Sequence, residues 1–214
     1  MPESIGAITD MKAFEQLGLL VLDGSGSMSD VGDTGQSKAN EVNLAVRSLV
    51  ARLKASRNRD NFYLGIITFD TKVKEDRVPP TAITQMDEFG DYDPLNGHGG
   101  GTHIGDALQK AADVARSFLS GQQRFPRSAV IVVMSDGQNR GGADPVAVAN
   151  AIKQSGQGIT ICCAAYGKGD DIDEQSLQRM VTNPSGYIHA YDTEQLRKFF
   201  EASISARRAS PTVG

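Results

Sequence analysis

The sequence predicts a doubly wound α/β fold, in which helices cover both faces of a mostly parallel six-stranded sheet with one antiparallel edge strand. Short apolar runs alternate with amphipathic helical patterns along most of the 214 residues, an order typical of βαβ units. The runs are continuously apolar, which is typical of strands buried on both faces. Five of them are expected to form strands: 17–22, 62–69, 129–134, 159–165 and 186–191.

The segments between these runs carry helix signals. Apolar side chains recur on one helical face in residues 42–53 and again in residues 104–119. An Asp-Pro pair at 144–145 predicts the start of a third helix. Asp192 followed by Gln195 resembles a capping box before the last helix. These helices are expected to cover the two faces of the sheet.

Residues 70–78 alternate weakly and follow the preceding strand too closely for a crossover connection, so they are expected to pair antiparallel at a sheet edge. No internal repeat or low-complexity linker interrupts the pattern. Residues 1–214 are therefore interpreted as one domain with its core at 17–206. We expect 1–16 to be an N-terminal extension and 207–214 a flexible tail.

The charge composition argues against one class of function, nucleic-acid binding. The chain has 22 Lys and Arg residues against 26 Asp and Glu residues, a formal net charge of −4. Nucleic acid is not an expected partner, because phosphate binding depends on clustered positive charge. Basic residues cluster at only five positions, which are interpreted as a solvated helix face. They are Arg47, Arg52, Lys54, Arg57 and Arg59.

The sequence also points to the cytoplasm. No stretch approaches the roughly 18 apolar residues that span a bilayer, and 17–22 is too short for the apolar part of a signal peptide. Membrane association is therefore not expected. Cys162 and Cys163 are adjacent on a predicted strand, so their side chains face opposite ways and cannot easily form a disulfide. Both are interpreted as packing residues in a reducing compartment.

Oxygen-bearing side chains follow the ends of the predicted strands. Asp23, Ser25 and Ser27 alternate with glycine directly after the first strand. Asp136 follows the strand that ends at residue 134, and Thr102 precedes the helix at 104–119. Open α/β sheets bind ligands beyond the carboxyl ends of their strands, so these side chains are expected to meet at one rim.

Two carboxylates and three hydroxyls suit a hard cation. Mg²⁺ or Mn²⁺ is favoured over Ca²⁺, and Zn²⁺ usually takes His or Cys ligands. Taken one at a time, the same residues have ordinary structural explanations: Ser27 as a turn residue, Thr102 as a helix N-cap and Asp136 as an Asx-turn former. Their conjunction at one rim favours a metal site.

This set resembles the von Willebrand factor A (VWA) domain family, whose metal-ion-dependent adhesion site (MIDAS) combines Asp-x-Ser-x-Ser with a later Thr and a later Asp. Asp23, Ser25, Ser27, Thr102 and Asp136 match those positions in order. The resemblance covers about residues 17–206. It implies that the three hydroxyls ligate the metal directly and that the two carboxylates act directly or through water. It also implies an open coordination position for an Asp or Glu of a partner protein.

Within that family the chain looks most like bacterial cytoplasmic members of the TerY type, named for tellurite resistance and often encoded with a kinase and a phosphatase. The resemblance implies a protein partner of this kind, such as a kinase or phosphatase of the same system. Residues around the metal are expected to form the partner-binding rim, with the 86–101 loop giving specificity. The rim residues are Gly26, Gly100, Gly101, His103 and Gly137.

Other residues have weaker signals. Asp30 lies where some adhesion-receptor relatives hold a second cation, but Val31 replaces the usual adjacent acid. His98 and His103 are interpreted as exposed loop histidines that could touch a ligand. Asp70 is interpreted as a turn residue. The rest are Asp106, interpreted as favouring its helix dipole, and the kinase-like motif Arg207-Arg208-Ala209-Ser210 in the tail.

Enzyme signatures are incomplete. A dinucleotide-binding loop would need glycine at Ser29, and a haloacid-dehalogenase-type phosphatase would need a second Asp at Ser25. A serine hydrolase elbow would need glycines at Asp23 and Ser27. A non-enzymatic, metal-dependent interaction domain is the leading hypothesis. The alternative is an Mg²⁺-dependent phosphotransfer or hydrolase enzyme that uses Asp23 or Ser25.

Overall fold

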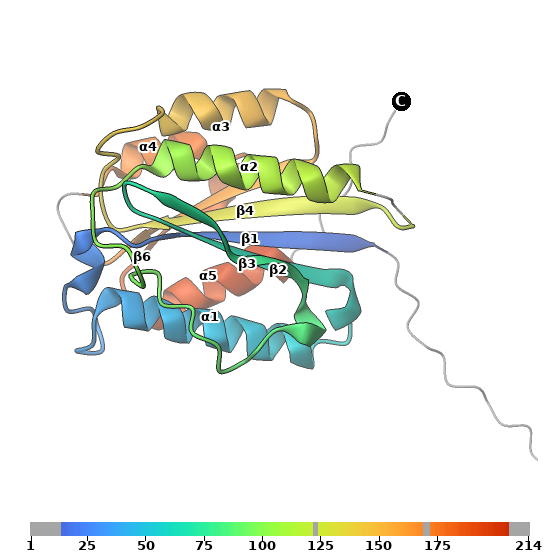
Figure 1. Cartoon of the computed structure of the whole chain (residues 1–214), viewed down its shortest axis with the longest axis horizontal. Coiled ribbons are helices and arrows are strands. Elements are labelled where there is room, and N and C mark those ends of the chain that lie inside the picture. The colour runs from blue at the N-terminus through green and yellow to red at the C-terminus, as the bar shows by residue number, and fades with distance from the viewer. Residues whose placement is uncertain (1–13, 122–123, 169–171, 206–214) are drawn as a thin grey trace, which may run out of the picture.

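The computed structural model describes residues 14–121, 124–168 and 172–205. It has a six-stranded sheet between two layers of helices (Figure 1). The strand order across the sheet is β3-β2-β1-β4-β5-β6. The strands are β1 (Glu15–Asp23), β2 (Phe62–Phe69), β3 (Val73–Ala82), β4 (Arg127–Ser135), β5 (Ile159–Tyr166) and β6 (Tyr187–Ala190).

All pairings in the sheet are parallel except that of β2 with β3, which is antiparallel at the edge. β1 lies between β2 and β4, so its carboxyl end lies beside the ends of both neighbours. This arrangement confirms the predicted fold class. It also places Asp23 at the point where the chain switches from one side of the sheet to the other, the usual ligand position in such folds.

Each face of the sheet packs against its own set of helices. Leu20 and Leu22 belong to a core that includes residues of α1 and α5, while Leu19 and Val21 belong to one with residues of α2 and α3. In Figure 1 these two helix layers lie on opposite sides of the sheet. The helices are α1 (Lys38–Ala55), α2 (Ile104–Ser120), α3 (Pro145–Gln154), α4 (Glu174–Met180) and α5 (Thr193–Ser205).

The side chains of the adjacent cysteines point to opposite faces of the sheet, as expected. Cys162 packs in the core under α1 and α5, and Cys163 packs in the core on the opposite face. Both thiols are buried. Burial raises the pKa of Cys163 above its ordinary value, which keeps the thiol protonated and unreactive.

Two strand boundaries and one short helix differ from the sequence prediction. β1 begins at Glu15 inside the expected N-terminal extension, because the Glu15 carboxylate pairs with Arg127 on β4 at 2.5 Å. β3 continues past Val78 through two prolines, which an edge strand tolerates because no neighbour needs their missing N–H groups. α4 was not predicted, because its seven residues contribute only two buried side chains.

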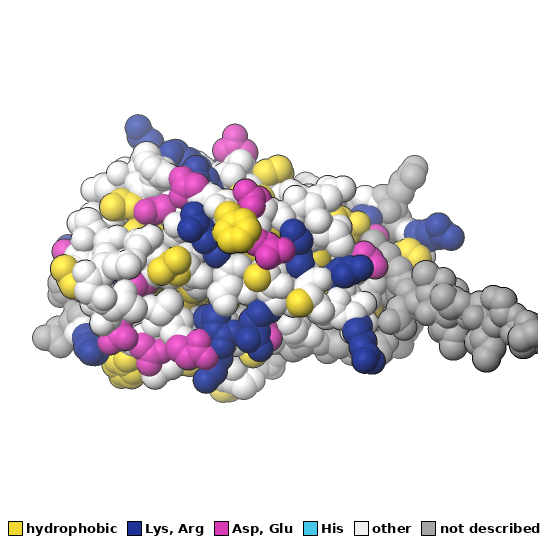
Figure 2. All heavy atoms as spheres, turned by 90° about the horizontal axis from the view of Figure 1, so that it is seen from below, with side chains coloured by type: hydrophobic (Ala, Val, Ile, Leu, Met, Phe, Trp, Pro, Cys, Tyr) yellow, Lys and Arg dark blue, Asp and Glu magenta, His cyan; other side chains and the backbone are white. Residues whose placement is uncertain are grey.

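The 86–101 loop packs along α1. The Arg47 guanidinium donates to the Gly90 carbonyl at 2.8 Å, and the Lys54 ammonium donates to the Met86 carbonyl at 3.0 Å. The interpretation of these two basic residues as a solvated face was therefore wrong. Figure 2, a view onto the α1 side, shows acidic and basic side chains next to each other across this face.

Within the described residues, no helix is both long enough and apolar enough to span a membrane. The predicted flexible tail at 207–214, including the kinase-like motif before Ser210, lies outside the described residues.

Candidate functional site

Three segments meet at the carboxyl edge of the sheet. They are the Asp23–Ser29 turn after β1, the loop that leads through Thr102 into α2, and the turn after β4 that carries Asp136. The Gly26 amide donates to the Gly100 carbonyl at 3.0 Å, which joins the first segment to the second. The Arg140 amide donates to the Thr102 carbonyl at 2.7 Å, which joins the second to the third.

Asp23 is completely buried at the end of β1. One carboxylate oxygen accepts the Ser25 backbone N–H at 2.8 Å, and the other accepts the Ser135 hydroxyl at 2.5 Å. Burial raises the pKa of Asp23 to about 6, and the neighbouring Asp136 carboxylate adds to that rise. The two hydrogen bonds oppose it. Asp23 therefore fixes the turn that presents the two serines.

The serine hydroxyls connect Asp23 to Asp136. Ser25 Oγ lies 3.2 Å from Ser27 Oγ, and the Ser27 hydroxyl donates to Asp136 Oδ1 at 2.8 Å. Ser25 is buried, whereas Ser27 and Gly26 are exposed. Four of the five predicted ligand residues are thus adjacent, and their cluster is closed toward the sheet and open to solvent at Ser27.

Thr102 is the fifth predicted ligand. It is buried, and its hydroxyl lies 4.0 Å from the position that a Cβ on Gly137 would occupy. The alternative reading of Thr102 as a helix N-cap was wrong, because α2 begins after His103 and its Ile104 N–H donates to the Asn139 side chain at 2.8 Å. Asn139 was missed in the sequence. With the helix end capped from another loop, the Thr102 hydroxyl has no capping role.

A buried pair holds the glycine loop before Thr102. His98 Nδ1 lies 3.0 Å from Asp70 Oδ1, and Asp70 Oδ2 accepts the Gly100 N–H at 2.9 Å. The His98 side chain is 1% exposed, so the prediction of an exposed loop histidine was wrong for this residue. Burial acts to raise the pKa of Asp70, but the N–H of Lys72, His98 and the N–H of Gly100 together lower it. Asp70 organises the rim in addition to forming a turn.

The predicted rim residues lie on the three segments that meet here. Gly26 and Gly100 are joined by the backbone bond described above, and Gly137 adjoins the Thr102 hydroxyl. Gly101 lies next to Thr71. His103 is partly exposed, and its Nδ1 lies 3.3 Å from the Asp106 carboxylate. Asp106 also accepts the Ala143 N–H at 2.9 Å, so it does more than favour the helix dipole.

The region of the suspected second cation site has a different organisation. Asp30 is exposed, and Val31 beside it is 73% exposed. The nearby buried acid, Glu41, accepts hydrogen bonds from Thr34 N–H, Thr34 Oγ1 and the Tyr166 hydroxyl. Burial would raise the pKa of Glu41, but these bonds lower it. Glu41 thus anchors the loop at 29–36 and is already satisfied without a cation.

Lys38 is a second residue near the site that the sequence did not predict. Its ammonium group lies 2.7 Å from Asp136 Oδ2, at the end of the carboxylate opposite the Ser27 bond. The two side chains are 13% and 0% exposed. Lys38 begins α1, and no sequence pattern connects it with a residue 98 positions away.

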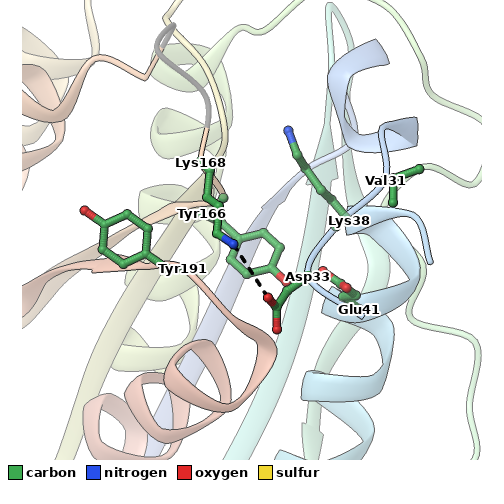
Figure 3. Close-up of a pocket in the computed structure, with 9 residues that line it drawn as sticks. Val31, Asp33, Lys38, Glu41, Tyr166, Lys168 and Tyr191 are labelled. Atoms are coloured by element: carbon green, nitrogen blue, oxygen red, sulfur yellow. Dashed lines mark hydrogen bonds and ion pairs between the residues drawn. The ribbon is translucent and has the colours of Figure 1, made fainter. Parts of the chain in front are cut away.

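A small pocket of about 90 Å³ adjoins Lys38. Lys38 and Glu41 line one side, and Lys168 and Tyr191 line another (Figure 3). The Lys168 ammonium points toward Asp33, from which it is 3.8 Å distant. The pocket is therefore adjacent to the Asp136 side of the cluster.

The chemistry of the cluster fits a hard divalent cation. Hydroxyl and carboxylate oxygens supply every candidate ligand. In the part of the chain that the structure describes, no three His, Cys, Asp or Glu side chains converge to hold a metal. An ion at this rim would therefore depend on the hydroxyls of Ser25, Ser27 and Thr102. Their role as ligands stays a prediction.

Comparison with known proteins places this geometry in context. Residues 19–202 match the family described as von Willebrand factor type A domain. The curated proteins gave no match to the chain. Solved structures, in contrast, gave many matches.

Three of these structures illustrate the likeness. The pilus adhesin SpaC from Lactobacillus rhamnosus GG has a TM-score of 0.71 and 14% identity, over 91% of this chain and 31% of that one. The mussel byssus protein PTMP1, with a zinc-occupied MIDAS motif, has a TM-score of 0.63 and 21% identity, over 90% and 48%. An aerotolerance-related membrane protein from Bacteroides fragilis NCTC 9343 has a TM-score of 0.62 and 22% identity, over 88% and 98%.

This chain spans less than a third of SpaC and about half of PTMP1, so these structures establish a shared fold and no more. The family match, in contrast, runs from β1 into α5. The chain therefore belongs to the von Willebrand factor type A domain family.

Proposed function

We propose that this chain is a metal-dependent protein-interaction module that binds an Asp or Glu of a partner protein. One observation carries the proposal: Ser25, Ser27 and Asp136 form a continuous oxygen cluster that is closed at Asp23 and open to solvent at Ser27. An open rim suits docking, because a large partner can reach it.

The residues of the chain have separate tasks in this proposal. Ser25, Ser27 and Thr102 would hold Mg²⁺ or Mn²⁺ through their hydroxyls, and Asp136 would balance its charge. Asp23 orients Ser25 through the hydrogen bond to its N–H. When bound, the ion supplies an electrophilic centre that a partner's carboxylate can complete. Zinc also belongs in the test, because PTMP1 holds it at a MIDAS motif.

The proposal excludes catalysis. The runner-up enzyme would use Asp23 or Ser25 as a nucleophile, which requires a reactive oxygen and a base beside it. Both Asp23 oxygens accept hydrogen bonds within the fold. The buried His98 has Thr68 Oγ1 at 3.0 Å from its Nε2 and Asp70 Oδ1 at 3.0 Å from its Nδ1. These contacts favour docking over chemistry.

The finer assignment follows from the sequence resemblance. We infer a cytoplasmic protein of the TerY-like bacterial type, with a kinase or phosphatase of a tellurite-resistance-like system as its partner. The 86–101 loop would supply specificity, because it packs against the Gly24 turn: a Cβ on Gly24 would lie 2.2 Å from the Pro94 carbonyl oxygen. The loop therefore borders the open side of the cluster.

Calorimetric titration of EDTA-treated protein with Mg²⁺, Mn²⁺ and Zn²⁺ tests the proposal. The probes are an acidic peptide and a control peptide in which Asn and Gln replace Asp and Glu. Saturable metal binding that tightens only with the acidic peptide and is absent in Asp23→Ala is expected. Acidic-peptide binding that survives both EDTA and Asp23→Ala would overturn it. Metal-dependent turnover on phosphoester or ester panels would favour the enzyme instead.

A further inference from the structure

Lys38 supplies a positive charge at the place where the proposed function needs a metal ion. We propose that Lys38 is an internal countercharge that makes metal binding depend on the partner's carboxylate. The inference rests on the proposed function and adds the regulation of that site.

The geometry places Lys38 in competition with the ion. The Asp136 carboxylate is fully buried, and its two oxygens are occupied by the Ser27 hydroxyl at 2.8 Å and the Lys38 ammonium at 2.7 Å. A cation that ligates Ser27 must therefore enter a cluster whose nearest carboxylate already has a charged partner. Lys38 either moves aside or stays as a like charge a few ångströms away, and both alternatives weaken metal binding.

The charges of the site explain why a partner would restore it. Asp23, Asp136 and Lys38 sum to −1 when the two acids are ionised. A divalent ion changes this to +1, and an incoming carboxylate changes it to zero. Without Lys38 the ion alone neutralises the two acids, and the partner's carboxylate leaves an excess negative charge. With Lys38 present, the site is electrically neutral only when both the metal ion and the partner's carboxylate are bound. Without Lys38, it is neutral with the metal ion alone.

Among the described residues, the two other acids that line this pocket, Asp33 and Glu41, have partners of their own. In Figure 3 the Lys38 ammonium points away from Asp33 and Glu41. Glu41 is engaged by Tyr166 and Thr34, and Asp33 faces Lys168 at 3.8 Å. The Lys38 charge is therefore directed to Asp136.

The position of Lys38 in its helix also indicates that its contact with Asp136 is what holds it there. Lys38 is the first residue of α1, after the N-cap Ser37. A cation at a helix N-terminus faces the positive end of the helix dipole, which disfavours lysine at this place. The contact with Asp136 accounts for a residue that the local structure opposes.

The test compares metal binding in four proteins: wild type, Lys38→Met, Lys38→Arg and Lys168→Met. Lys168 is the matched control, because it lines the same pocket but is 73% exposed and pairs with Asp33. Each protein is titrated with Mg²⁺ and Mn²⁺, with and without the acidic peptide. We expect Lys38→Met to bind metal at least about tenfold more tightly than wild type in the absence of peptide. The peptide should then improve its metal affinity much less than it improves that of wild type.

The two other variants separate charge from shape. Lys38→Arg should behave as wild type, because it keeps the charge, and Lys168→Met should also behave as wild type. Thermal melting gives an independent readout: Lys38→Met should melt lower than wild type in EDTA, because Asp136 loses its partner, and should gain more from added metal.

The outcomes also separate this inference from the proposed function. Equal metal affinity in wild type and Lys38→Met, or equal peptide enhancement, would overturn the inference and leave the metal site standing. If neither protein binds metal with or without peptide, the proposed function fails and the inference fails with it. An equal gain in Lys168→Met would assign the effect to general surface charge and overturn the role of Lys38.

Discussion

Asp23 ends β1 and Asp136 directly follows β4, so both lie at the same rim, yet their carboxylates have different kinds of hydrogen-bond partners. Asp23 is bound by groups of the fold itself, the Ser25 N–H and the Ser135 hydroxyl. Asp136 is bound by the exposed Ser27 and by Lys38, a long side chain that can rearrange. The Asp23 carboxylate therefore holds the serine turn in place, whereas the Asp136 carboxylate can exchange its partners when a metal ion or a partner protein binds.

This difference shows that residue type does not determine the role of a buried acid. The partners of each oxygen determine it: backbone and core hydroxyls give rigidity, whereas side chains that reach solvent can be displaced. Substitutions at the two carboxylates should therefore have larger effects than substitutions in the loops that support them.

Replacement of Asp23 should affect both stability and binding. Asp23→Ala leaves the buried Ser25 N–H and Ser135 hydroxyl unpaired and should lower the free energy of unfolding by about 2 kcal/mol. Metal binding should be lost, because the serine turn is no longer fixed. Urea denaturation in EDTA and calorimetry measure the two effects. Asp23→Asn is the matched variant: its amide keeps one acceptor oxygen for one of these two hydrogen bonds and removes the charge, so it should lose metal binding at a smaller cost in stability.

Replacement of Asp136 should separate the two effects. Asp136→Asn should abolish metal binding, as Asp23→Ala does, but lower the free energy of unfolding by only about 1 kcal/mol, because the amide oxygen still accepts the Ser27 hydroxyl and Lys38 can turn into the pocket that it lines. The same titrations and urea curves apply. A stability loss as large as that of Asp23→Ala would contradict the distinction between a fixed and an exchangeable carboxylate.

Asp70 holds the loop before Thr102 and is not a candidate ligand, so its replacement should weaken metal binding rather than abolish it. Asp70→Asn should lower the free energy of unfolding by about 1–2 kcal/mol at neutral pH, because charge-assisted bonds to Gly100 and His98 are lost. Metal affinity should fall about tenfold as the loop before Thr102 loosens.

The same residue gives a pH signature. The pKa of Asp70 is lower in the folded protein than its ordinary value of 3.8. Its stabilisation is therefore fully present above about pH 4 and is lost as the pH falls through the lower folded value. Urea curves at pH 7 and at acid pH should converge for wild type and Asp70→Asn as the pH falls. A constant difference would assign the effect to packing.

Asn139 should give the smallest effect. Asn139→Ala removes the acceptor for the Ile104 N–H and should lower the free energy of unfolding by about 1 kcal/mol, as loss of a helix cap does. Metal affinity should change less than about threefold, because the Asn139 side chain is hydrogen-bonded to Ile104 and Ala143 and not to a candidate ligand. A loss of metal binding comparable to that of Asp70→Asn would indicate that the helix end itself positions Thr102.

The sequence was sufficient for most of the sheet. Strands with continuous apolar runs stood out because burial on both faces admits few polar residues. The start of β1 at Glu15 and the short α4 were missed for the opposite reason: an ion pair with Arg127 buries a polar strand end, and seven residues are too few for a visible period. Four of the candidate ligands were found because they follow strand ends, and Thr102 was found because it precedes a helix.

The supporting residues were not predictable in the same way. Lys38 meets Asp136 across 98 positions, and Asn139 meets Ile104 across 35. His98 was assigned to the surface because loops are usually exposed. The contact with Asp70 buries it. No local pattern encodes such contacts, because they depend on which loops the sheet brings to one edge.

The sequence by itself thus determined the doubly wound fold, the family and the candidate ligands Asp23, Ser25, Ser27, Thr102 and Asp136, since periodicity and motif spacing are properties of the chain. Only the tertiary structure decided which carboxylate is fixed and which is exchangeable. It also decided that Lys38 stands beside Asp136. The physical reason is that electrostatic interactions act through distance in space, and distance in space is set by how the loops meet at the end of the sheet.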